Sequence, residues 1–173
     1  MYIYMMDIIQ LCINEIGNKG PFILFVSTIC LLWNHTMLVY YLCGFFVNII
    51  LNIILKIIIK DPRPSVDKSS FFLALKRNSN LIKIDMLGMP SGHAQSVVYS
   101  TIFIFLVLRQ WIPFYLFISL VTIYQRVNYR YHTILQVIIG SIIGSIFAYM
   151  VFFLAKNKLK GSMKLKMEDN API

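Results

Sequence analysis

The sequence predicts an all-α integral membrane protein: a polytopic helix bundle with about five transmembrane spans and a short interfacial helix. Hydrophobic residues make up 58% of the 173 residues, and the mean hydropathy of +0.73 is far above that of an ordinary soluble domain. These apolar residues form long runs separated by polar loops. A bundle of this size leaves no room for a second domain, so we expect residues 1–173 to form one unit.

The first apolar stretches are less regular than the later ones. Residues 1–20 are interrupted by charged and amide side chains, which is more typical of an interfacial N-terminal segment or a poorly ordered start than of a span. Residues 21–33 form an uninterrupted apolar run, short for a bilayer that needs about 20 residues. With the residues beside it, we expect this run to be the first span, and residues 36–59 to be the second.

The longest non-spanning stretch, residues 61–89, follows the second span. Within it, residues 67–78 mix Phe71 and Phe72 with basic side chains, a composition typical of an interfacial amphipathic helix. A solvated loop with a few apolar anchors explains the same composition.

Three further spans are predicted at residues 91–108, 113–125 and 133–155. In the last of them, Gly140 and Gly144 have the G-x-x-x-G spacing that favours close contact between helices.

The net charge of +9 comes from clusters of basic residues rather than from a continuous basic face. A chain that lies mostly in lipid offers no broad surface to nucleic acid, so we expect membrane lipids and a phosphorylated lipid as partners. The three cysteines stand singly, and no cluster of acidic residues is present near the basic ones. We therefore expect no metal and no cofactor.

Three polar stretches, residues 56–64, 90–93 and 126–136, lie at the ends of predicted spans. A topology with five spans brings all three to the same membrane face. A helix N-terminus adds free backbone N–H groups and the positive end of the helix dipole, which favour phosphate. Together the three stretches predict a phosphate site.

The side chains in these stretches suit phosphoryl transfer. Lys56, Arg63 and Arg126 can neutralise the phosphoryl oxygens. The Ser91 hydroxyl adds a donor, and Gly92 lets the backbone approach a ligand closely. The alternative for Lys56 alone is that it snorkels to the lipid headgroups, as lysines near helix ends often do.

Two histidines supply the reactive groups. His132 is placed as the nucleophile and His93 as the acid that protonates the leaving oxygen. Gln136 follows His132 by four residues, so the two share a helix face if the helix starts there. A lone histidine at a helix start, such as His93, is more often structural, so the assignment depends on the set as a whole.

In order along the chain, Lys56-x6-Arg63-Pro64, Pro90-Ser91-Gly92-His93 and Arg126-x5-His132 resemble the tripartite signature of the type 2 phosphatidic acid phosphatase superfamily. The resemblance implies a metal-independent phosphatase that works through a phosphohistidine, with His132 as nucleophile and His93 as general acid. It assigns phosphate binding to Lys56, Arg63, Ser91, Gly92 and Arg126.

The sequence departs from the superfamily pattern at two positions. Gln125 replaces the usual serine, and Gln136 replaces the usual aspartate that orients the imidazole. Gln136 can accept the imidazole N–H bond but lacks the charge. A glutamine here, together with Gln95, Asn48 and Asn52, is similar to the dolichyl diphosphatase branch. The resemblance therefore favours hydrolysis of the terminal phosphate of a polyprenyl diphosphate.

Two alternatives remain open at this stage. One is a broader lipid phosphate phosphatase that acts on phosphatidate-like monoesters. The other is a catalytically inactive lipid-binding membrane protein, because Gln136 replaces the usual aspartate of the superfamily.

The tail also bears on topology. Residues 156–173 contain five lysines, and we expect them to form a disordered tail that anchors the cytoplasmic side by the positive-inside rule. With five spans, the active site then lies on the non-cytoplasmic face, in an endoplasmic-reticulum-like or cell membrane.

Overall fold

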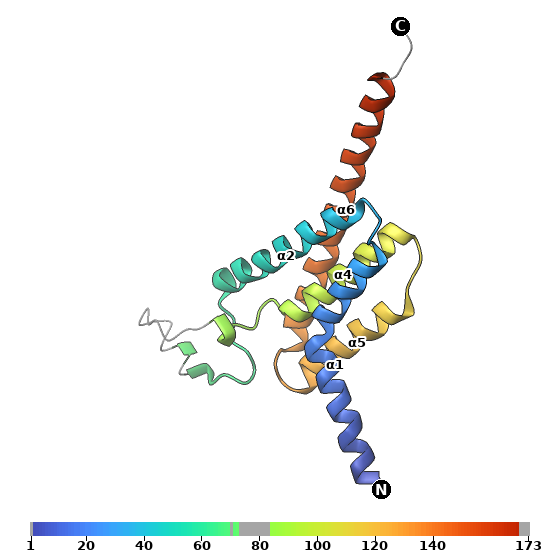
Figure 1. Ribbon diagram of the computed structural model, residues 1–173. Helices are drawn as coiled ribbons and strands as arrows, with labels where there is room; N and C mark the ends of the chain where they lie inside the picture. The colour runs from blue at the N-terminus through green and yellow to red at the C-terminus, as the bar shows by residue number, and fades with distance from the viewer. Residues whose placement is uncertain (1, 70, 73–83, 170–173) are drawn as a thin grey trace.

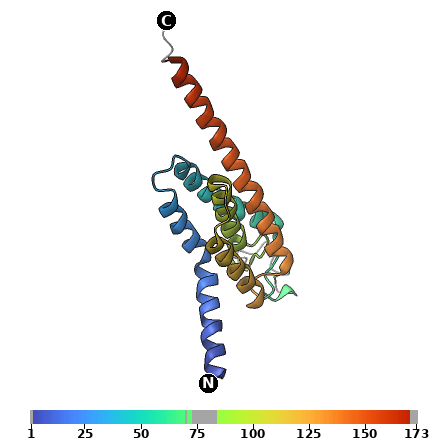
Figure 2. The same cartoon turned by 90° about the vertical axis from the view of Figure 1, so that its right-hand side faces the viewer.

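The computed structural model describes residues 2–69, 71–72 and 84–169, with side chains described at 7–69, 71–72 and 84–161. The protein is an all-α membrane helix bundle built from five long α-helices (Figure 1). Within the described ranges there is no β-strand, only an isolated bridge between Pro62 and Leu87. The start of α1 and the end of α6 project from opposite ends of the bundle (Figures 1 and 2).

Two helices are long and apolar enough to cross a membrane by length and composition: α2 (Met37–Ile59) and the first part of α6 (Ile134–Asp169). Shorter apolar helices, α4 (Gly92–Leu108) and α5 (Pro113–Asn128), lie between them in the chain. These four helices coincide with the predicted second to fifth spans, although α6 continues beyond residue 155; as span candidates, only α2 and α6 meet the test of length and composition. Large apolar side chains are exposed on their outer faces, as lipid contact requires.

The N-terminal region is helical from its first described residue. Helix α1 (Tyr2–Leu31) runs for 30 residues without interruption and contains Pro21, so one helix joins the predicted interfacial segment to the predicted first span. Two of its polar side chains, Asn14 and Asn18, bond to α5: the Gln125 side-chain amide donates to Asn14 Oδ1 (2.9 Å), and Arg126 donates to Asn18 Oδ1. A neighbouring helix therefore satisfies side chains that looked unsuited to a span.

Close packing holds α1 against α5. A Cβ added at Gly17 would lie 2.5 Å or less from the side chain of Gln125, and one at Gly20 would overlap Thr122. Only glycine permits this approach, and it carries the polar start of α1 to the end of α5.

The basic tail begins as a continuation of α6, which extends to Asp169. Residues 156–169 are rich in lysine, leucine and methionine, which are good helix formers, and contain one glycine and no proline. The predicted interfacial helix at 67–78 lies for the most part outside the described residues.

Helix α4 is the central element, since it contacts α1, α2, α5 and α6. Tyr99 and Phe103 on α4 are fully buried and pack with Tyr41 of α2, at ring-centroid distances of 5.4–5.9 Å.

The G-x-x-x-G prediction is confirmed. A Cβ at Gly140 would lie 2.6 Å from the carbonyl oxygen of Ser91, and one at Gly144 would overlap the Gln95 backbone. Helix α6 therefore passes close to the start of α4, where the polar stretches meet.

Candidate active site

The three predicted polar stretches meet at one end of α2, α4 and α6. Lys56 Nζ donates to the carbonyl of Leu87 (3.1 Å), and Arg63 Nε approaches the same oxygen (3.5 Å). The Ser91 N–H donates to the carbonyl of Gln136 (3.0 Å). These bonds join the end of α2, the start of α4 and the start of α6 into one site, as the five-span topology predicts.

Helix α2 ends as predicted, and its end folds back. Lys60 has a left-handed backbone (φ 52°) and its N–H donates to the Lys56 carbonyl, which closes the helix. The Arg63 N–H then pairs with the Met86 carbonyl (3.0 Å). Lys56 is only 7% exposed, so it points into the bundle and does not snorkel to the headgroups.

Arg126 lies in the last turn of α5 and is 5% exposed. One terminal nitrogen donates to Asn18 Oδ1 of α1 (2.5 Å), and the guanidinium stacks over the Tyr131 ring at 4.9 Å. Its Nε is buried and, within the described part of the chain, has no hydrogen-bond partner.

The Ser91 hydroxyl also lacks a hydrogen bond within the described part of the chain. It stands at the N-cap of α4, where a serine hydroxyl normally accepts a backbone N–H, yet it makes no such bond. Its Oγ is buried and has no partner among the described residues. A buried polar atom without a partner costs about 1–3 kcal/mol, so Ser91 Oγ and Arg126 Nε are suited to an incoming ligand with free oxygens.

Gly92, next to Ser91, accommodates a second layer of amides. A Cβ at this position would lie 2.9 Å from Asn52 Oδ1. Asn52 in turn donates to Gln95 Oε1 (2.8 Å) and to the Pro90 carbonyl, and Gln95 donates to Asn48 Oδ1 (2.8 Å). This buried amide network fixes the start of α4 against α2.

The hydrogen bonds of Gln136 define the tautomer of His132. Gln136 Oε1 accepts the Thr133 N–H (3.1 Å) and lies 3.2 Å from His132 Nδ1. Because this atom already accepts one bond, it is the amide oxygen, and His132 Nδ1 must carry the proton. The lone pair is then on Nε2, the atom available for attack.

The surroundings of His132 also keep it neutral. The side chain is 3% exposed and lies in the turn between α5 and α6. Burial, followed by the positive charge of Arg63, lowers the pKa of His132 to about 3, and the bond to Gln136 opposes this shift. A neutral imidazole is the form that a nucleophile needs.

The other end of the Gln136 amide reaches two groups that the sequence analysis did not single out. Nε2 donates to Asp61 Oδ2 (2.6 Å) and to the Pro62 carbonyl (3.0 Å). A Cβ at Gly88 would lie 2.5 Å from the amide, so a glycine is needed there.

His93 occupies the first turn of α4 and is half-buried. Its Nε2 donates to the backbone carbonyl of Asn18 (3.2 Å), the residue whose side chain also accepts from Arg126. Asn18 was missed because it belongs to none of the three polar stretches. Burial is the main influence on both imidazoles, and the charges of Lys56, Arg63 and Arg126 act on both of them as well, so His93 and His132 share one electrostatic site.

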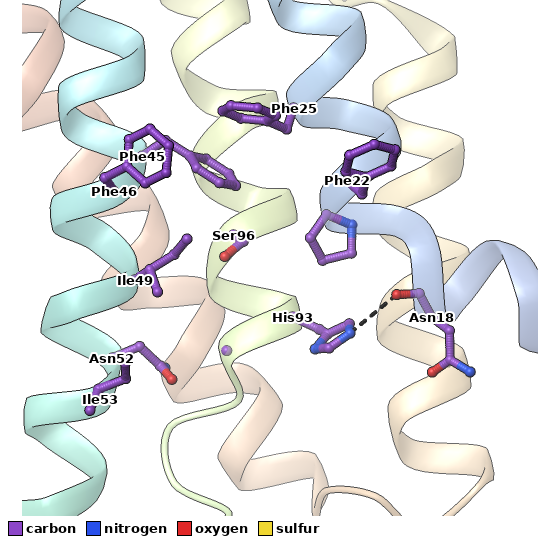
Figure 3. A pocket seen from close by; sticks show the side chains of 12 residues that line it. Asn18, Phe22, Phe25, Phe45, Phe46, Ile49, Asn52, Ile53, His93 and Ser96 are labelled. Carbon is purple, nitrogen blue, oxygen red and sulfur yellow. Dashed lines mark hydrogen bonds between the residues drawn. The ribbon is translucent and has the colours of Figure 1, made fainter. Parts of the chain in front are cut away.

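An apolar cavity of about 460 Å³ opens beside His93 between α1, α2 and α4 (Figure 3). Phenylalanines line one end of it, and His93, Asn18 and Asn52 lie at the other (Figure 3). The aromatic lining comprises Phe22, Phe25, Phe45 and Phe46. The cavity is therefore apolar along its length and polar where it meets the site.

Within the described ranges, no group of three histidine, cysteine or acidic side chains is placed to hold a metal ion.

The ends of these membrane helices gather two histidines, three cations and two buried donors that lack a partner among the described residues. Comparison with known families agrees: the PAP2 superfamily matches residues 37–160. The chain therefore belongs to the PAP2 superfamily, which confirms the resemblance at that level.

Two curated relatives come from Arabidopsis thaliana. Chloroplastic lipid phosphate phosphatase epsilon 1 is 29% identical over 119 residues, which cover 60% of this chain and 42% of the relative. Chloroplastic lipid phosphate phosphatase epsilon 2 is 31% identical over 100 residues, which cover 49% and 35%. The chain thus matches less than half the length of either relative. No solved structure matches it.

Proposed function

We propose that this protein is a membrane lipid phosphatase that transfers a phosphoryl group from a lipid to His132 and then to water. The observation that carries the proposal is a pair of buried donors, Ser91 Oγ and Arg126 Nε, that have no partner among the described residues and lie in the same site as an imidazole whose lone pair is on Nε2. Membership of the PAP2 superfamily and the printed names of the two relatives support the same class of activity.

In the first step, His132 Nε2 attacks phosphorus, and the bond from phosphorus to the lipid oxygen breaks. His93, in its imidazolium form, gives a proton to that oxygen and becomes neutral. In the second step, a water molecule gives a proton to His93 and attacks the phosphohistidine, so the N–P bond breaks and inorganic phosphate leaves. Each histidine returns to its starting state.

Three cations replace the charge that a metal ion would supply. Lys56, Arg63 and Arg126 converge on the site and can neutralise the phosphoryl oxygens, with Ser91 as a further donor. Activity should therefore persist in EDTA and be blocked by vanadate. Loss of activity on chelation that magnesium restores would contradict this part of the proposal.

The apolar cavity beside His93 supports a lipid as the substrate. A chain lying among its aromatic side chains would present its polar end to His93 and Asn18, where the leaving oxygen must be protonated. Because the cavity lies between helices of a membrane bundle, the lipid can keep its chain in an apolar environment throughout.

Within this class we propose a polyprenyl diphosphate, of the dolichyl type, as the substrate, because of the glutamine at position 136 and the amides Asn48, Asn52 and Gln95. The second candidate is a lipid phosphate monoester, which the names of the two relatives favour.

The deciding experiment is an assay of phosphate release by purified protein in detergent and EDTA. The two substrates are a polyprenyl diphosphate and a phosphatidate of matched chain volume, and the His132→Ala variant is the blank. A higher kcat/KM for the diphosphate supports the first candidate, and a higher value for phosphatidate supports the second. Release of phosphate from neither lipid would overturn the proposed function.

We also propose that the site faces the non-cytoplasmic side, in an endoplasmic-reticulum-like or cell membrane. The basic end of α6 is the basis, by the positive-inside rule. A tag placed after Ile173 should be cleaved by protease added to the cytoplasmic face of sealed vesicles. Protection of the tag would contradict this orientation.

A further inference from the structure

A continuous chain of hydrogen bonds runs from His132 through Gln136 to Asp61. The imidazole Nδ1–H donates to Gln136 Oε1 (3.2 Å), and Gln136 Nε2 donates to Asp61 Oδ2 (2.6 Å). Gln136 is 1% exposed, so water does not compete for these bonds. The Gln136 amide therefore lies between the Asp61 carboxylate and the His132 imidazole, and the negative charge of Asp61 polarises the amide toward the imidazole.

The position of Asp61 beside Gln136 depends on the turn that follows α2 and on one backbone hydrogen bond. Lys60 adopts a left-handed conformation and turns the chain back at the end of α2. The Asp61 carbonyl then accepts the Gly88 N–H (2.7 Å). This bond fixes the backbone of Asp61 beside α6 and aims its carboxylate at the Gln136 amide.

A negative charge near His132 would stabilise the imidazole when it attacks phosphorus. Attack on phosphorus makes the imidazole cationic, while Lys56, Arg63 and Arg126 are already positive and act on it unfavourably. Across the described residues, no other acidic side chain is hydrogen-bonded to Gln136. Among the described residues, no ion pair involves Asp61, so a nearby cation does not cancel its charge directly.

We propose that Asp61 is a positioning residue for the nucleophile: acting through the Gln136 amide, it supplies the negative charge that Gln136 itself lacks. This inference rests on the proposed function. Asp61 holds Gln136 with its oxygen toward His132 and stabilises the cationic imidazole that forms when the N–P bond is made. Asp61 does not touch the substrate, so its removal should lower kcat and leave KM nearly unchanged.

The proposal changes what is expected of substitutions at Gln136. Introducing a carboxylate there in the presence of Asp61 would set two negative charges against each other with no donor between them. A carboxylate at Gln136 is useful only if Asp61 becomes an amide, because the donor and acceptor between the two positions are then exchanged.

The experiment is therefore a charge-exchange cycle with Asp61→Asn, Gln136→Glu and the double variant, each close to isosteric. Asp61→Asn alone should lower kcat by about tenfold or more, the usual effect of losing a group that orients an imidazole from outside. In the Gln136→Glu background, the same Asp61→Asn change should instead raise kcat. Asn14→Ala, on α1, is the control for general loss of amide contacts, and thermal unfolding in detergent monitors folding.

The expected result is that Asp61→Asn lowers kcat in the wild-type background and raises kcat in the Gln136→Glu background. Losses in both backgrounds would mean that Asp61 is merely structural, and no loss in the wild-type background would mean that its charge is not used. Either outcome overturns the proposal. If Asp61→Asn alone does not fold, the comparison of Gln136→Glu with the double variant decides the question.

A second measurement does not depend on turnover. In protein labelled with ¹⁵N-histidine, the His132 signals are those that disappear in His132→Gln, since the chain has three histidines. The Nδ1 proton of His132 should be present in the wild type and should move upfield in Asp61→Asn, because the acceptor amide is less polarised. An unchanged Nδ1 resonance would contradict the proposal, whereas an inactive wild type would contradict only the proposed function.

Discussion

The two histidines lie in contrasting halves of the same site. The nucleophile half, named for the role we propose for His132, is buried, and Gln136 fixes the hydrogen bond of the imidazole. In the acid half, named for the role we propose for His93, this side chain is half-buried, bonds to a backbone carbonyl of α1 and borders the apolar cavity. The first half lies within the segment that the PAP2 superfamily matches, whereas α1 lies outside it.

This difference separates two tasks. A rigid, buried nucleophile half is suited to a single chemical step, because its geometry does not depend on which lipid arrives. The acid half is built in part by α1 and borders the cavity, so it is the half in which substrate preference can vary. We therefore expect substitutions in the nucleophile half to lower kcat for all substrates alike. Substitutions in the acid half should lower kcat by different factors for different substrates.

The largest effect is expected from His132→Ala. Without Nε2 there is no route to the covalent intermediate, so phosphate release should fall to the background of the assay for every substrate. Ile134→Ala, on an exposed side chain two residues away, is the control and should remain active. Turnover by His132→Ala comparable to that of the wild type would contradict the assignment of His132 as the nucleophile.

The next effect is expected from His93→Ala, and it should be unequal. Proton donation is typically worth about 10²–10⁴-fold, and it matters most when the leaving oxygen is basic. The loss of kcat should therefore be larger for a lipid monoester than for a diphosphate, whose leaving group is already a phosphate. Equal losses for both substrates would show that His93 does not protonate the leaving oxygen.

A smaller loss is expected from Ser91→Ala, with an opposite effect on stability. Removal of one donor to a developing phosphoryl charge costs about 10²–10³-fold in kcat. The hydroxyl has no partner in the described structure, so its removal should leave the free energy of unfolding equal or higher. Thermal unfolding measured beside kcat checks both, and parallel losses of stability and activity would assign Ser91 a structural role.

Helix α1 can be tested by Asn18→Ala. This change removes the side-chain acceptor of Arg126 but keeps the backbone carbonyl that His93 contacts. A hydrogen bond to a charged group is worth about 1.5–3 kcal/mol, so we expect a loss of about tenfold in kcat/KM. Asn14→Ala, which removes a contact to Gln125 instead, should have less effect, and the reverse order would contradict a role for Asn18 in the site.

The smallest effect concerns pH. Because the pKa of His132 is lowered to about 3, the imidazole stays neutral as pH falls from 7 to 5, and only below that range does protonation remove the nucleophile. With a substrate whose leaving group needs no acid, kcat/KM corrected for substrate ionisation should be flat over this interval. A decline centred near the ordinary histidine value of about 6.5 would show that burial does not control His132.

The same contrast explains which features the sequence predicts. Lys56, Arg63 and His132 sit where spans end, and the order of spans alone brings them together. Asp61 was missed because its position depends on the left-handed turn at Lys60 and the bond to Gly88, which are tertiary features. In the acid half, the sequence indicated His93, Gly92 and Asn52, which line the cavity, but not Asn18 of α1.

The N-terminal region shows the same limit. The polar residues of α1 were judged against lipid and water, whereas the structure sets Asn14 against Gln125 of α5. Local composition cannot reveal which helix will cover a polar face, so the continuity of α1 and the place of Asn18 in the site both escaped prediction.

The central claim is that His132 carries the phosphoryl group during turnover. Rapid quenching of the wild type with lipid labelled in its terminal phosphate should leave label on the protein that is stable to base and labile to acid, as a phosphohistidine is. Fragmentation should place the label at position 132, and His93→Ala should still acquire it from a diphosphate. Turnover without bound label, or label on any other residue, would contradict the account.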